Sequence, residues 1–450
     1  MKRRWYIFGL VAIVAGTLAV NAQLGRDYTN EFLNTSTGRA LMQAYGAIKS
    51  GYLTEVDDEV LIRGAITGMV ESLDDQFSSY VEPRAAARER QDSSGSFGGI
   101  GAVLTAHDRN TGKGVEILTV YQGSPASGAG LQRGDVFLEV DEVDVRNLTS
   151  SEVADLVRGP EGTEVTLVMN RPGTEEPLTF VITRGVIQIV DVSSTLLEGN
   201  VGYVALSSFN NRLLNDQMVE QIDQLILQGA QSLVLDLRDN PGGLLPQAVY
   251  VADEFLEEGP IVYQRSRGVT QLYGAAQRGS YDLPLVVLVN QNSASASEIV
   301  AGALQESGRA VVIGEQTFGK GVGQTVISLS DGSQLQYVSF EWLTPDRTSI
   351  SERGVTPDII VTDTRFPSTV VAEGRGLREG QTVQLVVDGE VIGEVLAEED
   401  GTFTLLALGG LRETSSVQGQ ALVDLENDAV LQAALSVLAG ETVVGENNNN

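Results

Sequence analysis

The chain has 450 residues, of which 42% are hydrophobic and 20% charged, and its formal net charge is −30. This length predicts two to four domains, and the composition is typical of a folded protein. The acidity favours solubility and argues against nucleic acid as a partner, because phosphate binding needs clustered Lys and Arg. The sequence contains no cysteine, which excludes disulfides, thiol nucleophiles and a lipidated cysteine anchor.

The first 22 residues are typical of an export signal. A basic start, Lys2-Arg3-Arg4, precedes the uncharged apolar run Trp5–Val20. Small residues near Ala22 offer a cleavage site, and the run is somewhat short for a membrane span. A cleaved signal, a membrane anchor and a buried N-terminal helix all remain open. Either form of export predicts a location in the periplasm or cell envelope.

The next two regions differ in their periodicity. Residues 27–92 carry apolar side chains at three- and four-residue spacing, which predicts helices. Within them, Arg84–Gln91 is expected to be a charged linker. Residues 95–185 contain Gly-rich punctuation and short alternating runs such as Val115–Val120, which indicate strands. Two helices are expected there, a short one within 123–135 and a second at Ser150–Val157.

The remainder is predicted to contain an α/β core followed by a small β module. In residues 190–365, buried apolar strands alternate with helices, which is typical of a parallel sheet covered by helices. Residues 367–420 form short strands joined by Asp-Gly turns, and their role cannot be read from the sequence. Residues 421–450 end in a helix, Ala429–Leu438, and an Asn-rich tail expected to be disordered. The predicted fold is therefore multidomain, combining α/β and α+β regions.

A serine-rich junction is the first candidate for chemistry. The segment Gln291–Ile299 fills the turn between an apolar strand and a helix with small residues, among them Ser295. A nucleophile gains most at such a junction, because the turn is sharp and helix N-terminal amides stabilise an anion. A serine-rich helix cap explains the same segment equally well.

A nucleophilic serine needs a base, and the sequence offers few. The single histidine, His107, lies in the β-rich region and is expected to be an exposed loop residue. Lysine is the other base, provided that burial lowers its pKa. Lys320 follows the strand after the serine helix, in Gly319-Lys320-Gly321. The spacing of a phosphate-binding loop and the Ser-x-x-Lys arrangement of penicillin-binding proteins are both missing.

Taken together, several motifs resemble the C-terminal (tail-specific) processing peptidases, Ser-Lys serine proteases that carry a PDZ domain. The resemblance covers Gly64 to Asp358 and is weaker near Asp424–Leu438. The motifs are Leu73-Asp74-Asp75, Phe97-Gly98-Gly99-Ile100-Gly101, Gly123-Ser124-Pro125-Ala126, Leu235–Gly243, Ser293–Glu298 and Gly319-Lys320-Gly321. The resemblance implies a protease core of the crotonase and ClpP-like type that needs no metal or cofactor.

The resemblance also implies roles for individual residues. Ser295 is the nucleophile, Lys320 is the base and Gln324 orients the lysine. Gly242 or Gly243, together with the amide of Ala296, would form an oxyanion hole. These glycines could also serve only to form a tight strand-to-helix turn. The structural role and the oxyanion role are compatible.

The β-rich region, residues 95–185, is interpreted as the PDZ domain. Such a domain binds the free carboxylate of a peptide and adds the peptide as a strand. The carboxylate loop would consist of Phe97, Gly98, Gly99, Ile100 and Gly101. Arg158 resembles a family position that couples the PDZ domain to the active site. The expected partners are proteins or peptides with free C-termini.

Two other functions compete with an exported serine endopeptidase. A non-catalytic envelope adaptor on a protease-like fold is one alternative, although Ser295, Lys320 and Gln324 are all present. A trypsin-like PDZ protease is the other, and the lack of a second histidine near the core argues against it. The physiological substrate and the oligomeric state, including a homo-oligomer, stay open.

Overall fold

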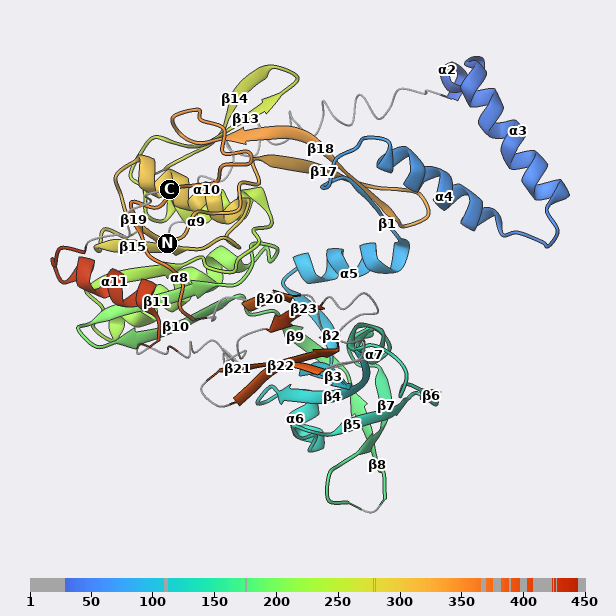
Figure 1. The fold of residues 1–450 in the computed structure, drawn as a ribbon, viewed down its shortest axis with the longest axis horizontal. Helices are drawn as coiled ribbons and strands as arrows, with labels where there is room; N and C mark the ends of the chain where they lie inside the picture. Colours follow the sequence, from blue (N-terminus) through green and yellow to red (C-terminus); the bar gives the residue numbers. More distant parts are fainter. Residues whose placement is uncertain are drawn as a thin grey trace. The chain divides into compact units, whose positions relative to one another are not determined.

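The computed structural model describes residues 29–443, apart from 109–111, 175, 278, 280, 366–369, 375–381, 388–389, 397–402, 408–422, 424 and 426 (Figure 1). The chain divides into two compact units, Met1–Tyr80 and Val81–Asn450. The predicted export signal and the Asn-rich tail lie outside the described residues. Among the described helices, none is both long and apolar enough to cross a membrane.

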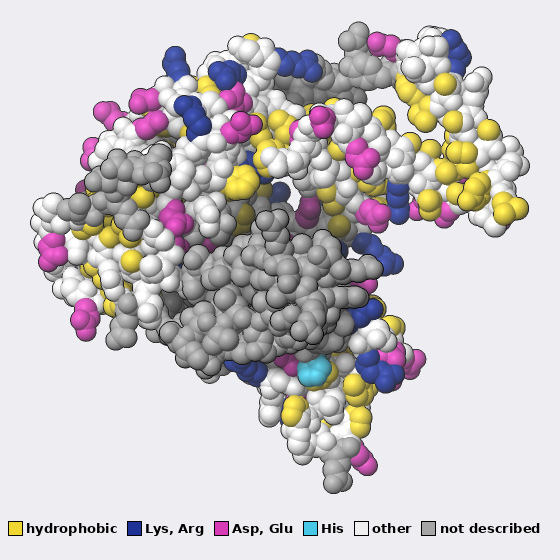
Figure 2. Space-filling model, viewed as in Figure 1, with side chains coloured by type: hydrophobic (Ala, Val, Ile, Leu, Met, Phe, Trp, Pro, Cys, Tyr) yellow, Lys and Arg dark blue, Asp and Glu magenta, His cyan; other side chains and the backbone are white. Residues whose placement is uncertain are grey.

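Helices dominate the first unit, as predicted. They are α2 (Thr29–Asn34), α3 (Ser36–Gly51) and α4 (Asp58–Glu71). Thr35 caps α3 by accepting the Gly38 amide at 2.9 Å, and Asp57 caps α4 by accepting the Glu59 amide at 2.9 Å. Many of the periodic apolar side chains are exposed, and they are visible as hydrophobic atoms along these helices in Figure 2. The apolar period therefore predicts the helices correctly without marking a buried core in this unit.

The expected linker at Arg84–Gln91 is wrong, because these residues form helix α5 (Pro83–Ser93). Proline opens the helix, where its missing N–H costs nothing, and three alanines follow. The charged residues Arg88, Glu89 and Arg90 mask this helical tendency in the sequence. A short strand, β1 (Ser79–Val81), also interrupts the region predicted to be helical.

The β-rich region folds as a twisted antiparallel sheet with two helices. The sheet order is β3 (Ala102–Asp108), β4 (Lys113–Val120), β5 (Val136–Val140), β7 (Glu164–Asn170) and β8 (Leu178–Thr183), with β6 (Val143–Asp144) beside β5. Helix α6 (Pro125–Ala129) lies within the predicted 123–135, and α7 covers Ser150–Val157 as predicted. Strand β3 lies at the edge of the sheet. β2 (Ser96–Gly99) and β9 (Gly185–Gln188) pair with each other where the chain enters and leaves this domain.

The predicted α/β core is confirmed as a six-stranded sheet. Its order is β10 (Val192–Leu197), β11 (Val201–Leu206), β12 (Ser232–Asp236), β15 (Leu285–Val289), β16 (Val311–Gly314) and β19 (Ile359–Ile360). All neighbours are parallel except β10 and β11. Helices α8 (Leu214–Leu227), α9 (Leu245–Asp253) and α10 (Ala296–Glu306) pack on one face, and α11 (Ala429–Leu438) packs on the other. Both faces are covered, so the strands carry continuous apolar runs.

The core region, residues 190–365, also contains an antiparallel sheet, which was not predicted. It contains β17 (Val322–Ser328), β18 (Gln334–Leu343), β13 (Pro260–Ser266) and β14 (Val269–Ala275). Strand β14 is mostly exposed, and β17 and β18 are half-buried. None of these three strands therefore shows a strong apolar run in the sequence. In the β module, β21 (Thr382–Val387), β22 (Glu390–Leu396) and β23 (Phe403–Ala407) match the three predicted strands, and β20 (Val370–Gly374) adds a fourth. Its predicted Asp-Gly turns lie outside the described residues.

Candidate active site

Ser295 lies on a strained turn between β15 and α10. Its backbone has φ of 55° and ψ of −110°, outside the regions that a side chain normally allows. Such strain persists only where surrounding contacts fix it. Here the Ser293 hydroxyl donates to the carbonyl of Leu237 at 2.8 Å, and the Ser297 hydroxyl donates to the carbonyl of Asn240 at 2.9 Å. The two flanking serines therefore tie this turn to the loop that follows β12.

That loop, residues 237–243, approaches Ser295 through two glycines. Gly242 has φ of 93°, and a Cβ placed on it would lie 2.8 Å from both Ser295 Cβ and the Ala296 nitrogen. A Cβ on Gly243 would lie 2.4 Å from the backbone of Phe209 and Asn210. Glycine at 242 therefore allows the close approach to Ser295, and glycine at 243 allows the close approach to the Phe209–Asn210 backbone.

The hydrogen bonds distinguish the two glycine amides. The Gly242 amide donates to Asn240 Oδ1 at 2.9 Å and is therefore occupied. Among the described residues, the amides of Gly243 and Ala296 donate to no other protein group. Ala296 is also the first residue of α10, where amides lack a partner within the helix. Of the two glycines, Gly243 is therefore the one whose amide has no other acceptor among the described residues.

Glu298 connects the Ser295 turn to the Lys320 segment. Its carboxylate is fully buried and accepts the Ser295 amide at 2.7 Å and the Lys320 amide at 3.0 Å. It also accepts the Thr317 hydroxyl at 2.6 Å and the Gly319 amide at 2.7 Å. Burial raises the pKa of Glu298, and these four donors oppose that rise by favouring the ionised form.

The backbone of Lys320 is fixed at both its amide and its carbonyl, and its amide donates to Glu298. Its carbonyl accepts the indole N–H of Trp342 at 2.9 Å. Burial lowers the pKa of the Lys320 ammonium, and the negative charge of Glu298 partly opposes this fall. Lys320 is half-buried, which is the setting that a lysine needs to act as a base.

Gln324 and His107 lie in strands on different domains. Gln324 is half-buried on β17, four residues after Lys320, and its neighbour across the sheet is Val338. His107 lies in strand β3 and not in the expected loop, and its imidazole is 2.7 Å from Glu116. Its side chain is 56% exposed. The sequence expectation of exposure is right, and the expectation of a loop is wrong.

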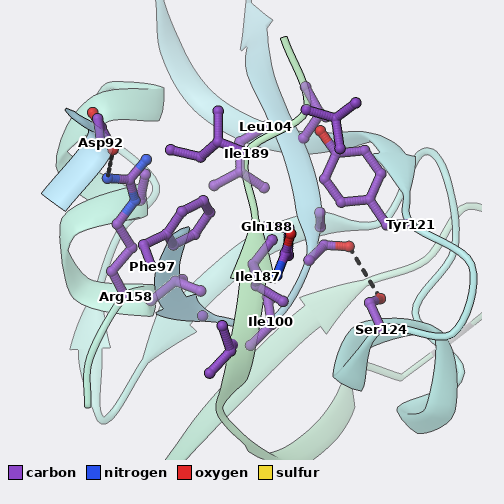
Figure 3. Close-up of a pocket in the computed structure, with 18 of the residues that line it drawn as sticks. Asp92, Phe97, Ile100, Leu104, Tyr121, Ser124, Arg158, Ile187, Gln188 and Ile189 are labelled. Atoms are coloured by element: carbon purple, nitrogen blue, oxygen red, sulfur yellow. Dashed lines mark hydrogen bonds and ion pairs between the residues drawn. The ribbon is translucent and has the colours of Figure 1, made fainter. Parts of the chain in front are cut away.

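The predicted carboxylate loop borders a cavity of about 1000 Å³, which is lined by residues of the β-rich domain together with Ser208, Asn210 and Asn211 of the α/β core (Figure 3). Phe97, Gly99, Ile100 and Gly101 line this cavity, whereas Gly98 does not. Gly98 packs against the turn that follows α7, since a Cβ there would lie 2.0 Å from the carbonyl of Gly159. Further lining comes from apolar side chains of β3, α7, β9 and the segment after β9, namely Leu104, Val157, Ile187 and Ile189.

Arg158 closes one end of this cavity. It follows α7 as its C-cap, and its guanidinium lies 4.2 Å from the centre of the Phe97 ring. It also forms an ion pair with Asp92 at 2.9 Å, as Figure 3 shows. Arg158 therefore connects the carboxylate loop to the end of α5, which carries Asp92.

Comparisons with known proteins identify the family of this chain. Residues 200–361 match the model of peptidase family S41, residues 116–171 match a PDZ domain, and residues 18–85 match the N-terminal domain of the activating protease CtpB. The carboxy-terminal-processing protease of Bartonella bacilliformis is 37% identical over 368 residues, which cover 80% of this chain and 83% of the relative. The chain belongs to the carboxy-terminal processing proteases.

Two further relatives carry similar names. The carboxy-terminal processing protease CtpA of Bacillus subtilis is 35% identical over 80% of this chain and 78% of the relative. The solved structure of a photosystem II D1 C-terminal processing protease is 35% identical, covers 74% of this chain and 88% of that chain, and has a TM-score of 0.42.

Sequence reasoning missed several residues that build this candidate site. Glu298 was only part of a motif, although Ser295-x-x-Glu298 has the spacing of a capping box, which predicts contact with the Ser295 amide. Asn240, which occupies the Gly242 amide, and Asp92, the partner of Arg158, carry no comparable local pattern. Their partners come from elsewhere in the fold or depend on the exact turn.

Proposed function

We propose that this protease hydrolyses peptide bonds through an acyl-enzyme formed on Ser295. Neutral Lys320 takes the proton of the Ser295 hydroxyl as the oxygen attacks the scissile carbonyl, and the ammonium then returns the proton to the leaving amine. The acyl-enzyme is released by water, with Lys320 again acting as the base. Gln324 orients Lys320 in this proposal.

The oxyanion is assigned to the amides of Gly243 and Ala296. Within the described part of the chain these two amides have no other protein acceptor, which supports this choice over Gly242, whose amide already donates to Asn240. Donors that are fixed before the reaction stabilise the developing charge without reorganisation. The single observation that best supports the whole mechanism is the Glu298 carboxylate, because it binds the amides of both Ser295 and Lys320.

The PDZ domain selects substrates by their C-terminal tails in this proposal. The tail would add to β3, the edge strand beside the cavity, with its carboxylate at the Gly99–Gly101 loop. An apolar terminal side chain suits the apolar side chains that line part of the cavity, such as Ile100 and Leu104. The substrates are therefore unfolded or flexible proteins with free, apolar C-termini.

The decisive experiment incubates the purified full chain with an unfolded protein that has an apolar C-terminus. Ser295→Ala should remove cleavage, whereas Ser330→Ala, at an exposed turn, should cleave like the wild type. Cleavage by Ser295→Ala at a wild-type rate would exclude the mechanism. A non-catalytic adaptor predicts no cleavage by any variant but retained binding of tail peptides.

Export places the catalytic region outside the cytoplasmic membrane. The basic and apolar start of the sequence supports this proposal. Protease added to intact spheroplasts should degrade the chain. Protection of the chain, with the membrane shown to be sealed by a cytoplasmic marker, would overturn the proposed location.

A further inference from the structure

A buried cluster of charged side chains lies behind the loop that approaches Ser295. Arg238 is at its centre, with a guanidinium that has no exposed side-chain surface. Three carboxylates surround it, those of Asp236, Asp363 and Asp428, and their side chains are 3%, 6% and 5% exposed. Burying charges this deeply is costly unless each is paired, so the geometry of the cluster is tightly constrained.

The members of this cluster come from distant parts of the chain. Asp236 ends β12, and Asp428 stands at the start of α11, 190 residues after Arg238. Arg238 donates to both oxygens of Asp428, at 2.7 and 2.8 Å, while its Nε donates to Asp236 Oδ1 at 3.0 Å. A bidentate pair of this kind fixes orientation as well as distance. The last helix is thus joined directly to the loop after β12.

Asp428 has a second role at the same position. Its Oδ1 also accepts the amide of Leu431 at 3.0 Å, so it caps α11. The face of α11 that contains Val430 and Leu431 packs on the central sheet, which anchors the helix independently of the ion pair. Asp428 therefore presents its carboxylate to Arg238 from a rigid support.

The loop that Arg238 begins continues into the oxyanion glycines. Next to Arg238, Asp239 accepts the side-chain amides of Asn290 at 2.9 Å and Asn292 at 2.8 Å. A second arginine, Arg365, donates to Asp239 at 2.8 Å from the segment after β19. The backbone carbonyl of Asn240 then accepts the amide of Ala294, the residue immediately before Ser295, at 3.0 Å. The back of this loop is held by the C-terminal segment and its front by the Ser295 turn.

We propose that Asp428 is a positioning residue for catalysis, which acts through Arg238 to hold the Gly242-Gly243 loop against Ser295. The C-terminal segment is thereby part of the active site, although it lies beyond residues 200–361 that match the peptidase model. This inference rests on the proposed oxyanion role of the loop. Misplacing a catalytic group by about 1 Å can lower the rate about 100-fold, so a small shift is enough to be measured.

The test substitutes Asp428→Asn in the full chain. Asparagine caps helices as well as aspartate does, so α11 should stay in place while the charge that holds Arg238 is lost. The matched control is Asp57→Asn, which changes the exposed cap of α4 in the first unit. Both variants are compared with the wild type at a temperature well below unfolding, per folded molecule counted by circular dichroism.

The expected result is a split between transition-state and ground-state effects. For Asp428→Asn, kcat should fall about 10- to 100-fold with KM nearly unchanged, because only the oxyanion donors are displaced. The inhibition constant of a peptide aldehyde, which forms a tetrahedral adduct on serine, should rise by the same factor as kcat/KM falls. The affinity of a tail peptide for the PDZ domain should not change. Asp57→Asn should behave like the wild type.

Other outcomes separate this inference from the mechanism beneath it. A kcat for Asp428→Asn within threefold of the wild type overturns the positioning role, whatever happens to the melting temperature. An aldehyde constant that stays constant while kcat falls also overturns it. If Asp428→Asn does not fold, Asp428→Glu, which keeps the charge but not the geometry, is measured in the same way. Wild-type cleavage by Ser295→Ala would instead refute the serine mechanism itself.

Discussion

Around Ser295, the backbone is held by buried polar side chains, whereas the cavity beside the carboxylate loop is lined by a mixture of apolar and polar side chains. Asn240 and Glu298 are both fully buried and accept amides on the two sides of the Ser295 turn. The cavity, in contrast, is bordered by Phe97, Ile100 and Leu104. Polar networks specify one arrangement, because each unpaired buried group is costly. Apolar linings accept any side chain of suitable size, since the hydrophobic effect has no direction.

The difference teaches where this protease can tolerate variation. Small displacements at the catalytic turn should be severe, because the developing charge needs fixed donors. Changes at the cavity should alter which tails bind, with smaller losses for each contact. Both regions are positioned by arginines, yet Arg238 is completely buried while the Arg158 side chain is 27% exposed. Replacing the buried arginine should therefore cost more free energy than replacing the partly exposed one.

The largest effect is expected from Lys320→Ala. The proposed general base would be lost, so kcat should fall by about 1000-fold or more, given the contribution that such bases typically make. The control is Lys113→Ala, which removes an exposed lysine of β4. Rates are measured with the same unfolded substrate, and circular dichroism verifies the fold. Activity of Lys320→Ala within tenfold of the wild type would rule out the lysine as the base.

A smaller loss is expected from Glu298→Gln, together with a shift in pH dependence. Glutamine has one acceptor oxygen where glutamate has two, so at least part of the four-donor cluster is lost and the plateau rate should fall about 100-fold. The negative charge of Glu298 raises the pKa of Lys320, so removing it should lower that pKa further. The rising limb of the pH profile should therefore move to lower pH in this variant.

For the wild type, kcat/KM should rise about tenfold per pH unit until Lys320 has lost its proton, and then level off. Burial places this limb below the ordinary pKa of lysine. A limb near pH 6.5 that disappears in His107→Ala would contradict the assignment and implicate the histidine. Since His107 is exposed in the PDZ domain, His107→Ala should leave the limb unchanged.

Buried apolar runs made the α/β core predictable. Strands such as Val201–Leu206 and Val311–Gly314 can be recognised from the sequence, because both of their faces are covered and the apolar pattern is continuous. The helix Ser150–Val157 is equally clear from its cap. The half-buried hairpin of β17 and β18 was missed, because its pattern depends on partners that only the fold supplies.

In the candidate site, too, local sequence patterns reveal some residues, whereas others depend on the fold. Ser295 and Lys320 stand out because serines cluster at one junction and lysines are scarce. The contacts that position them depend on long-range pairing, as between Arg238 and Asp428, and no local pattern encodes such a pair. The choice between Gly242 and Gly243 needed the hydrogen bond from Gly242 to Asn240, which depends on the turn geometry.

Tail recognition should respond more mildly than catalysis. Amidating the C-terminus of a peptide substrate removes a charged acceptor from the Gly99–Gly101 loop. A hydrogen bond to a charged group contributes about 1.5 kcal/mol or more, so binding should weaken about tenfold or more. Affinity is measured with labelled tail peptides, as free acid and as amide. Equal binding and equal cleavage of the two forms would refute recognition of the tail, and the chemistry at Ser295 would be unaffected.

The smallest effect is expected from Arg158→Ala. Arg158 stacks on Phe97 and pairs with Asp92, and each of these partly exposed contacts contributes about 1 kcal/mol or less. Turnover of a good substrate should therefore fall only about three- to tenfold, a range that such energies imply. If Arg158 couples the cavity to the active site, kcat should fall while the affinity of the tail peptide changes less. Asp92→Ala, which breaks the ion pair but keeps the arginine, should reproduce part of the loss in kcat. A variant Arg158→Ala with wild-type kcat and weakened tail binding would instead make Arg158 a binding residue, and would leave the PDZ domain a tether without influence on catalysis.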